Sequence, residues 1–510
     1  MLDGLVMFSN ALWGFLSNPL MILYVLGATQ LGIIVGMLPG LTATMGVALM
    51  TTLTFKMEPD AAVLILVCMY VGAIYGGSRS AILLNIPGTP ANAATAVDGH
   101  PLALQGLAGR AIGIATTGSF LGSVIGLLML AFFTPLIGNF ALKFKSFEFF
   151  WLAIFGIVIC GNLTAPKDPL KGWISGFLGL LVATIGMEPY HAYQRFAFGF
   201  MDLSGGIHLI PAMVGAFGFA EIITVMKQRR VEVVRGKIDR IFPRMQDISK
   251  YWRSIIRSGL VGTFVGAVPG VGEDIAAWTS YDLAKTASKE PEKFGKGSIE
   301  GLLAAETGNN SAVAGAMIPV LSLAIPGSAP AAVLLAAMFI HGVRPGPLIM
   351  IEFPEFVYQV VAMVLLATTA MFILGLAMVR PLVKVLAIPR EKLMPVVFVL
   401  CVIGSYAIQA RLFDVGVMVV FGFIGYYMRE MDYPIAPMVL GIILGTILDK
   451  NLIRALIISE GNPLYFVESP ISMVIASVTL ITFFSRTRWF MALKRNILDT
   501  LKIRILRRSK

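Results

Sequence analysis

Long apolar segments follow one another along almost the whole chain, and short polar connections separate them. A transmembrane helix needs about 20 mainly apolar residues, so this pattern predicts an all-α integral membrane protein. In the first half we expect elements at 31–55, 60–76, 80–96, 109–139, 147–163, 170–186 and 208–226. In the second half we expect 258–284, 300–322, 324–340, 351–380, 394–409, 412–428 and 433–449, followed by one unpaired span at 466–484.

Two Pro-Gly motifs occur in each half, in the same order. Residues 32–40 (GIIVGMLPG) and 262–270 (GTFVGAVPG) are identical at five of nine positions. Residues 84–91 (LNIPGTPA) match 323–330 (LAIPGSAP), and 211–215 parallel 437–441. Internal duplication of this kind is common in transporter folds. The two motifs are 48 residues apart in the first half and 57 in the second, and the charged stretch 285–296 accounts for the difference as a loop insertion.

Composition agrees with a membrane protein, because 57% of the residues are hydrophobic and only 14% are charged. Soluble domains have about 25% charged residues. The formal net charge of +11 comes from two segments: residues 226–258 have ten basic and three acidic residues, and 486–510 have nine basic and one acidic. A polybasic surface for anionic lipid or RNA is the alternative reading, but no aromatic stacking platform accompanies these charges.

Short basic loops remain in the cytoplasm, so both basic segments are expected there. The second repeat and one extra span separate them, and together these must cross the membrane an even number of times. Each repeat therefore crosses an odd number of times, five if the broken segments re-enter on the side they left, and the two halves are inverted. The predicted organisation is an N-terminal interfacial segment (1–30), transmembrane repeat 1 (31–226), a basic cytoplasmic linker (227–257), inverted repeat 2 (258–450), an extra helix (451–485) and a basic cytoplasmic tail (486–510).

The Pro-Gly breaks are the predicted substrate site. Proline removes a helical hydrogen bond and glycine lets the backbone leave helical geometry, and backbone freed in this way must line a cavity or contact protein. Half-helices that begin at a break direct N–H groups toward an anion. Close helix packing through small residues is the alternative explanation. The predicted substrate-binding residues are Pro39, Gly40, Asn85, Pro87, Gly88, Thr89, Asn92, Pro269, Gly270, Pro326, Gly327 and Ser328, with Thr89 and Ser328 as the best candidates for carboxylate contacts.

A second set of polar residues is predicted to couple transport to a cation. Glu306 is an ionisable residue inside an expected span, which makes it a default functional candidate, although a position at the helix end is the alternative. The predicted ion-coupling residues are Glu306, Asn309, Asn310 and Ser322. Four other acids are expected at solvated membrane ends: Asp98, Glu221, Asp274 and Asp449. Arg79 and Arg344 flank the Ile-Pro-Gly regions and either attract an anion or extend to the interface.

The sequence indicates neither a disulfide, nor a metal site, nor an enzymatic active site. The cysteines Cys68, Cys160 and Cys401 lie singly in apolar stretches, and the four histidines lack metal-binding spacing. No phosphate-binding loop, nucleophile elbow or paired catalytic carboxylates occur, so we expect no enzymatic activity, no resident metal and no cofactor. The first charge is Asp3, without the basic region of a cleaved signal peptide.

Several stretches resemble the large membrane (permease) subunit of the bacterial tripartite tricarboxylate transporter family. The most specific are 75–90 (YGGSRSAILLNIPGTP) with 98–101 (DGHP), 300–328 from Glu-Gly through Glu306 to Ile-Pro-Gly-Ser, and 341–347 (HGVRPGP). Many relatives have proline where this chain has Ala305. The resemblance implies an inner-membrane permease that works with a small four-span membrane subunit and a periplasmic solute-binding protein. It also implies import of small carboxylates by cation symport, with Na⁺ as the expected ion, and an elevator-type motion.

The negative charge of a carboxylate substrate makes coupling of its import to a cation necessary. Importing one negative charge against an inside-negative potential costs about 2.3 kcal/mol per 100 mV, so a trianion costs roughly 7 kcal/mol. Two alternatives have different signatures: a channel-like anion pore would conduct without accumulating substrate, and an intramembrane enzyme would need catalytic groups that the sequence lacks.

Overall fold

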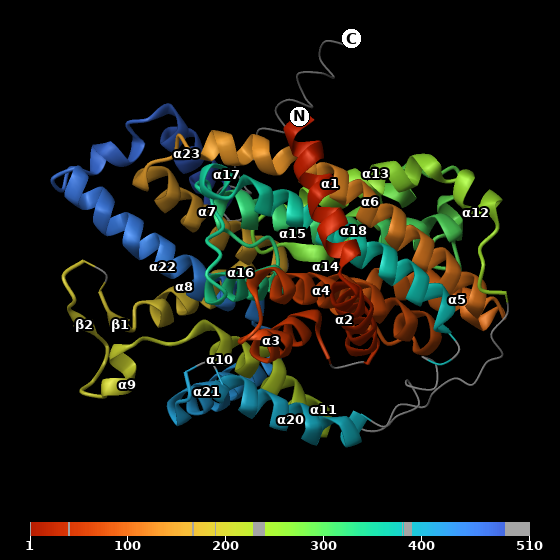
Figure 1. Cartoon of the computed structure of the whole chain (residues 1–510), viewed down its shortest axis with the longest axis horizontal. Helices are drawn as coiled ribbons and strands as arrows, with labels where there is room; N and C mark the ends of the chain where they lie inside the picture. The colour runs from red at the N-terminus through yellow and green to blue at the C-terminus, as the bar shows by residue number, and fades with distance from the viewer. Residues whose placement is uncertain are drawn as a thin grey trace, which may run out of the picture.

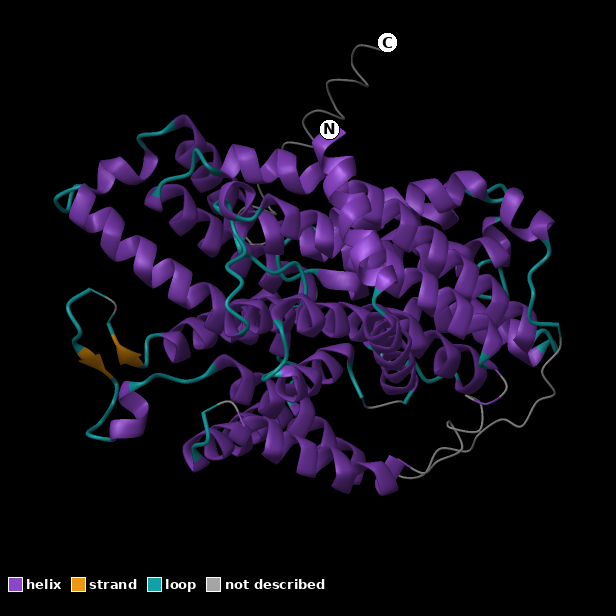
Figure 2. Cartoon of the chain, viewed as in Figure 1, coloured by secondary structure: helices purple, strands orange, loops and turns teal. Residues whose placement is uncertain are grey.

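The computed structural model describes residues 2–38, 41–165, 168–188, 190–227, 240–379, 381, 390–407 and 409–484. This part of the chain is helical apart from one small antiparallel sheet, in which β1 (Gly186–Met187) pairs with β2 (Gln194–Arg195) (Figure 1). Within it, eight helices are long and apolar enough to cross a membrane. The all-α membrane class predicted from the sequence is confirmed (Figure 2).

The first half contains α1 (Leu2–Ser17), α2 (Pro19–Met37), α3 (Ala43–Thr54), α4 (Pro59–Leu84), η1 (Pro90–Asn92), α5 (Ala93–Leu104), α6 (Ala108–Ala141), α7 (Ser146–Thr164), α8 (Pro169–Ala183), α9 (Met201–Ser204), α10 (Leu209–Met213), the π-helical turn η2 (Val214–Phe219) and α11 (Ala220–Lys227). The second half contains α12 (Met245–Ser249), α13 (Trp252–Gly266), α14 (Gly272–Ala287), η3 (Pro291–Lys293), α15 (Ile299–Leu323), α16 (Ala329–Ile340), α17 (Ile349–Glu352), α18 (Pro354–Ala377), α20 (Arg390–Ala407), α21 (Leu412–Glu430), α22 (Ile435–Ile458), η4 (Pro463–Val467) and α23 (Pro470–Phe484).

Two long central helices organise the core, α4 in the first half and α15 in the second. α2 and α3 pack against α4, and α13 and α14 pack against α15. Small residues permit this close approach, because a Cβ on Gly36 would overlap the carbonyl oxygen of Ala73, and one on Gly266 would overlap that of Ala312. The repeated glycines therefore have the same packing role in both halves.

After each central helix the chain turns back on itself through an Ile-Pro-Gly sequence. We call residues 85–92 the first tip and residues 324–328 the second tip. Each tip begins with a left-handed residue, Asn85 (φ 55°) or Ala324 (φ 57°). The glycine N–H of each tip then bonds back to its central helix, Gly88 to Gly77 O and Gly327 to Ala316 O, both at 3.4 Å. Both tips thus fold back beside the body of the preceding helix.

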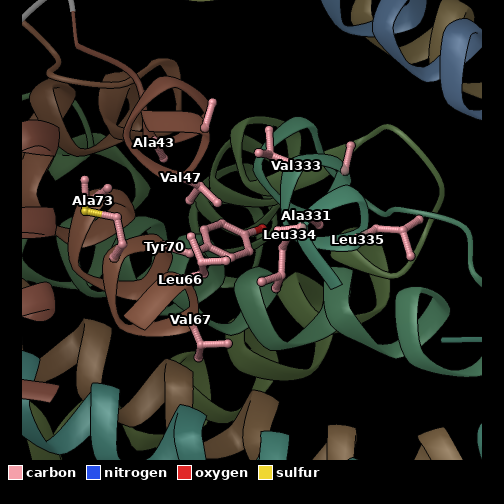
Figure 3. Close-up of a cluster of buried hydrophobic side chains, with 14 of the residues drawn as sticks. Ala43, Val47, Leu66, Val67, Tyr70, Ala73, Ala331, Val333, Leu334 and Leu335 are labelled. Atoms are coloured by element: carbon pink, nitrogen blue, oxygen red, sulfur yellow. The ribbon is translucent and has the colours of Figure 1, made fainter. Parts of the chain in front are cut away.

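The centre of the molecule is densely packed. In α4 every residue from Ala61 to Ile82 is buried, and Figure 3 shows Tyr70 reaching toward Ala331 and Leu334 of α16. In α15 every residue from Gly301 to Ser322 is buried. α15 is not among the eight apolar spans, because its polar residues lower its hydropathy, but it has the predicted position of a span.

Helix boundaries differ from the predicted ones at several places. The first broken segment begins at residue 19, because Asn18 Oδ1 accepts the N–H of Leu20 and Pro19 occupies the first helical turn. α22 extends two turns past the predicted end at 449 and reaches Ile458. α8 ends at Ala183, and the chain then forms the antiparallel pair of β1 and β2, which the sequence did not predict.

Three of the four acids that were expected at solvated membrane ends form hydrogen bonds or ion pairs in the structure. Asp98 is fully buried, so the prediction that it is solvated is wrong. Its Oδ1 accepts the N–H groups of Gly295, Gly297 and Ser298 at 2.8–2.9 Å, and its Oδ2 accepts the Tyr281 hydroxyl at 2.9 Å. Three peptide donors compensate for the lost hydration of this carboxylate. Glu221 pairs with Arg429 and Asp449 pairs with Arg195, while Asp274 is exposed.

Candidate substrate and ion site

The described breaks of the two halves lie on elements that pack against one another inside the protein. In the second half, Gly270 N–H donates to Pro326 O at 3.3 Å and Gly272 N–H donates to Gly327 O at 3.0 Å, which joins the α13–α14 turn to the second tip. Across the halves, η1 packs against α14, and α16 packs against α3. Pro39 and Gly40 lie outside the described residues.

Glu306 lies at the centre of a polar network. Its side chain is fully buried and accepts hydrogen bonds from Ser78 Oγ at 2.7 Å, from Ser119 Oγ at 2.6 Å and from Thr95 Oγ1. These hydroxyls come from three different helices, α4, α6 and α5. The structure therefore excludes a position of Glu306 at a solvated helix end.

The network continues from Glu306 to the first tip. Ser78 Oγ accepts the Asn92 amide N–H at 3.0 Å, and Asn92 Oδ1 accepts the Thr89 hydroxyl at 2.6 Å. Asn92 Nδ2 also donates to Ile74 O at 3.2 Å. The predicted substrate residue Thr89 is thus connected to the predicted ion-coupling residue Glu306 through two hydrogen-bonded side chains, those of Asn92 and Ser78.

The neighbouring amides of α15 are buried but only partly bonded. Asn310 Nδ2 donates to Ser119 Oγ at 2.9 Å and to Glu306 O at 3.1 Å. Neither polar atom of the Asn309 side chain has a partner in the described part of the chain, and neither does Asn310 Oδ1. Ser322 Oγ donates to Ile318 O at 2.7 Å within its own helix. Buried amide oxygens without donors are groups that a cation could use.

The second tip has a network of its own, around an acid that the sequence reasoning did not consider. Ser328 Oγ lies 2.6 Å from the Tyr70 hydroxyl, which in turn donates to Glu273 Oε1. Ser328 Oγ also accepts the Ala331 N–H at 3.3 Å and so caps α16. Glu273 is only 3% exposed. Its position directly after the 269–270 break was the available signal in the sequence.

Within the described residues, neither Glu306 nor Glu273 has a basic partner. In the described residues, no Lys, Arg or His forms an ion pair with Glu306 or Glu273. The buried Arg79 donates instead to Tyr75 OH at 3.1 Å and to Gly375 O at 2.5 Å. Arg344 is exposed. A buried carboxylate without a counter-charge is costly, which makes both glutamates candidates for binding a cation.

The other predicted residues have mainly conformational roles in this structure. Gly270 has a φ of +73°, and the Cys160 thiol donates to its carbonyl at 3.2 Å. Gly88 and Gly327 face backbone of α2 and α13, where a Cβ would overlap the carbonyl oxygens of Gly36 and Gly266. Asn85 is exposed in its left-handed conformation. Pro269 and Pro326 are buried at the junction of the breaks, and Pro87 is half-buried in the first tip.

A helical fold with eight possible membrane spans, and with buried acids beside broken helices, is a common plan of membrane transporters. The chain belongs to the Tripartite tricarboxylate transporter TctA family, which it matches over residues 22–440. It is 35% identical over 475 residues to an "Uncharacterized 52.8 kDa protein in TAR-I ttuC' 3'region" of Agrobacterium vitis, covering 92% of this chain and 94% of the relative. It is also 34% identical over 220 residues to an "Uncharacterized protein in TAR-II ttuC' 3'region" of the same organism, covering 43% of this chain and 91% of the relative. No solved structure matches.

The family resemblance found in the sequence is therefore confirmed. Membership makes the chain a permease of a tricarboxylate transporter family and implies a system with further subunits.

Proposed function

We propose that the chain imports small di- or tricarboxylates by symport with a cation, expected to be Na⁺, in the bacterial inner membrane. Its partners in this proposal are a small four-span membrane subunit and a periplasmic solute-binding protein. The observation that supports the proposal most is the buried Glu306 carboxylate, bonded to three hydroxyls where the broken helices meet. An intramembrane acid without a basic partner is suited to bind a coupling cation.

Local geometry supports an inverted relation between the halves. The equivalent helices α4 and α15 run in opposite directions, because the end of α4 lies beside the start of α15. His100 Nδ1 lies 3.0 Å from Ile82 O near the end of α4, and Asp98 accepts the N–H of Ser298, which caps α15. Inverted repeats around a central site are a common plan of secondary transporters.

The proposed orientation follows from the basic segments. Arg110 and Asp247 form an ion pair at 2.6 Å, so the start of α6 lies beside the central basic segment. Lys227 pairs with Glu430, so the end of α21 lies beside that segment too. We assign this end to the cytoplasm by the positive-inside rule. Motion of a substrate-carrying unit that contains both tips, in the manner of an elevator, completes the proposal.

The test is uptake of carboxylates into vesicles that contain the permease and its partners. We expect accumulation against a concentration gradient, and we expect it to collapse when an ionophore removes the cation gradient. Separate Na⁺ and pH gradients identify the ion. Unchanged uptake without any cation gradient would overturn the symport mechanism, and conductance without accumulation would indicate a channel.

A further inference from the structure

We propose that Glu273, Tyr70 and Ser328 form a second site for a monovalent cation, separate from the Glu306 network. The cation is either a sodium ion or a proton, and it is one of those counted in the transport stoichiometry. This inference rests on the proposed symport function and adds a site and an order of binding to it.

The three side chains come together from different parts of the chain. Glu273 belongs to the first turn of α14, Ser328 caps α16, and Tyr70 extends from α4 toward α16, where Figure 3 shows it beside Ala331 and Leu334. The Tyr70 ring is fully buried and Ser328 is 3% exposed. Three oxygen-bearing side chains therefore meet inside an otherwise apolar cluster.

The chemistry of the cluster suits a cation. It offers a carboxylate and two hydroxyl oxygens beside the unwound segments 267–271 and 324–328, and such unwound segments in transporters commonly bind Na⁺ or H⁺. In the described residues the carboxylate has no basic partner. A bound monovalent cation, or a proton on the carboxylate, would neutralise this buried charge.

The same geometry limits how a substrate can use Ser328. Ser328 Oγ is 2.6 Å from the hydroxyl that bonds to Glu273, so a substrate carboxylate at Ser328 would lie close to a like charge. Like charges at short range in a poorly hydrated site repel strongly. The cation must therefore bind first, and by reciprocity substrate binding then strengthens cation binding. This binding order couples cation binding to substrate binding, although cation and substrate do not contact each other directly.

The experiment measures cation-to-substrate stoichiometry from reversal potentials, using the complete complex in vesicles. The variant is Glu273→Gln, and the matched control is Asp282→Asn, an exposed acid on the same helix. We expect Glu273→Gln to lower the stoichiometry by one cation and to keep substrate exchange, while the control matches wild type. The cation is Na⁺ if the Na⁺ gradient contributes less to the reversal potential of the variant, and a proton if the pH gradient contributes less.

Two outcomes separate this inference from the proposed function. A wild-type complex without any cation coupling means that the symport function itself is wrong. Normal wild-type coupling with an unchanged stoichiometry in Glu273→Gln overturns the second site alone.

If the complex with Glu273→Gln does not assemble, the second site is tested with Tyr70→Phe, because this variant keeps the carboxylate and the aromatic ring. Losing one hydroxyl ligand, worth about 1 kcal/mol, should raise the cation concentration for half-maximal uptake by about five-fold. An unchanged value would overturn the proposal.

Discussion

The two tips have the same backbone path but different side-chain chemistry. Both begin with a left-handed residue, and both return a glycine N–H to the central helix at 3.4 Å. The Thr89 hydroxyl of the first tip is connected to Glu306 through Asn92 and Ser78, whereas Ser328 of the second tip contacts Tyr70, which bonds directly to Glu273. The two tips thus share the Pro-Gly residues that set the backbone and differ in their polar partners.

Each network also needs a residue from the other half. Glu306 of α15 completes the network of the first tip, and Tyr70 of α4 completes that of the second. The two central helices therefore build the candidate site jointly, and neither half holds a complete network alone. The variants below separate what the tips share from what distinguishes them.

The largest expected effect concerns the shared backbone. Gly88→Ala and Gly327→Ala each place a methyl group on a carbonyl oxygen, of Gly36 or Gly266, so both should destabilise the protein by about 3 kcal/mol or more. The measurement is the amount of monodisperse protein left after heating in detergent.

Gly416→Ala is the control for this pair, because it lies exposed on α21 with no described atom within 4 Å of a new Cβ. It should be neutral or slightly stabilising. Wild-type stability in one tip variant alone would show that the two tips do not share their packing.

The second-largest expected effect concerns Glu306, the acid in the hydrogen-bond network of the first tip. Glu306→Gln removes the buried charge and keeps the shape, so gradient-driven uptake should fall at least ten-fold, about 1.4 kcal/mol or more in the transport step. Binding of the partner subunits should not change. Glu292→Gln, at an exposed position, is the matched control. Full uptake by Glu306→Gln would remove this residue from the coupling site.

Intermediate effects are expected for the tip hydroxyls themselves. Thr89→Val leaves Asn92 Oδ1 without its donor, whereas Ser328→Ala removes both the α16 cap and the contact with Tyr70. Each lost interaction is worth about 1 kcal/mol, so Ser328→Ala should reduce the uptake rate more, and both proteins should still insert into the membrane. Thr286→Val on the exposed face of α14 is the control. Wild-type uptake in both tip variants would contradict the assignment of carboxylate contacts.

These contrasts show what the sequence could and could not predict. Repeated Pro-Gly motifs predicted both tips, because glycine and proline act through local backbone geometry. Glu306 was found because a charge stands out in an apolar segment. Glu273 was not considered in the sequence, although it closely follows the 269–270 break. Its burial depends on Tyr70, 203 residues away, and such contacts leave no local pattern.

The smallest effect distinguishes the first residue of each tip. Asn85 and Ala324 have nearly the same left-handed conformation, with φ of 55° and 57°, yet asparagine tolerates this region better than alanine. Exchanging them should therefore shift stability in opposite directions: Asn85→Ala should cost about 0.5–1 kcal/mol, and Ala324→Asn should gain a similar amount. Ala324 is half-buried, beside a cleft of about 720 Å³ that leaves room for the larger side chain. Thermal unfolding of the two single variants in detergent measures both shifts. If both variants are destabilised, the left-handed backbone preference does not account for the choice of residue at these two positions.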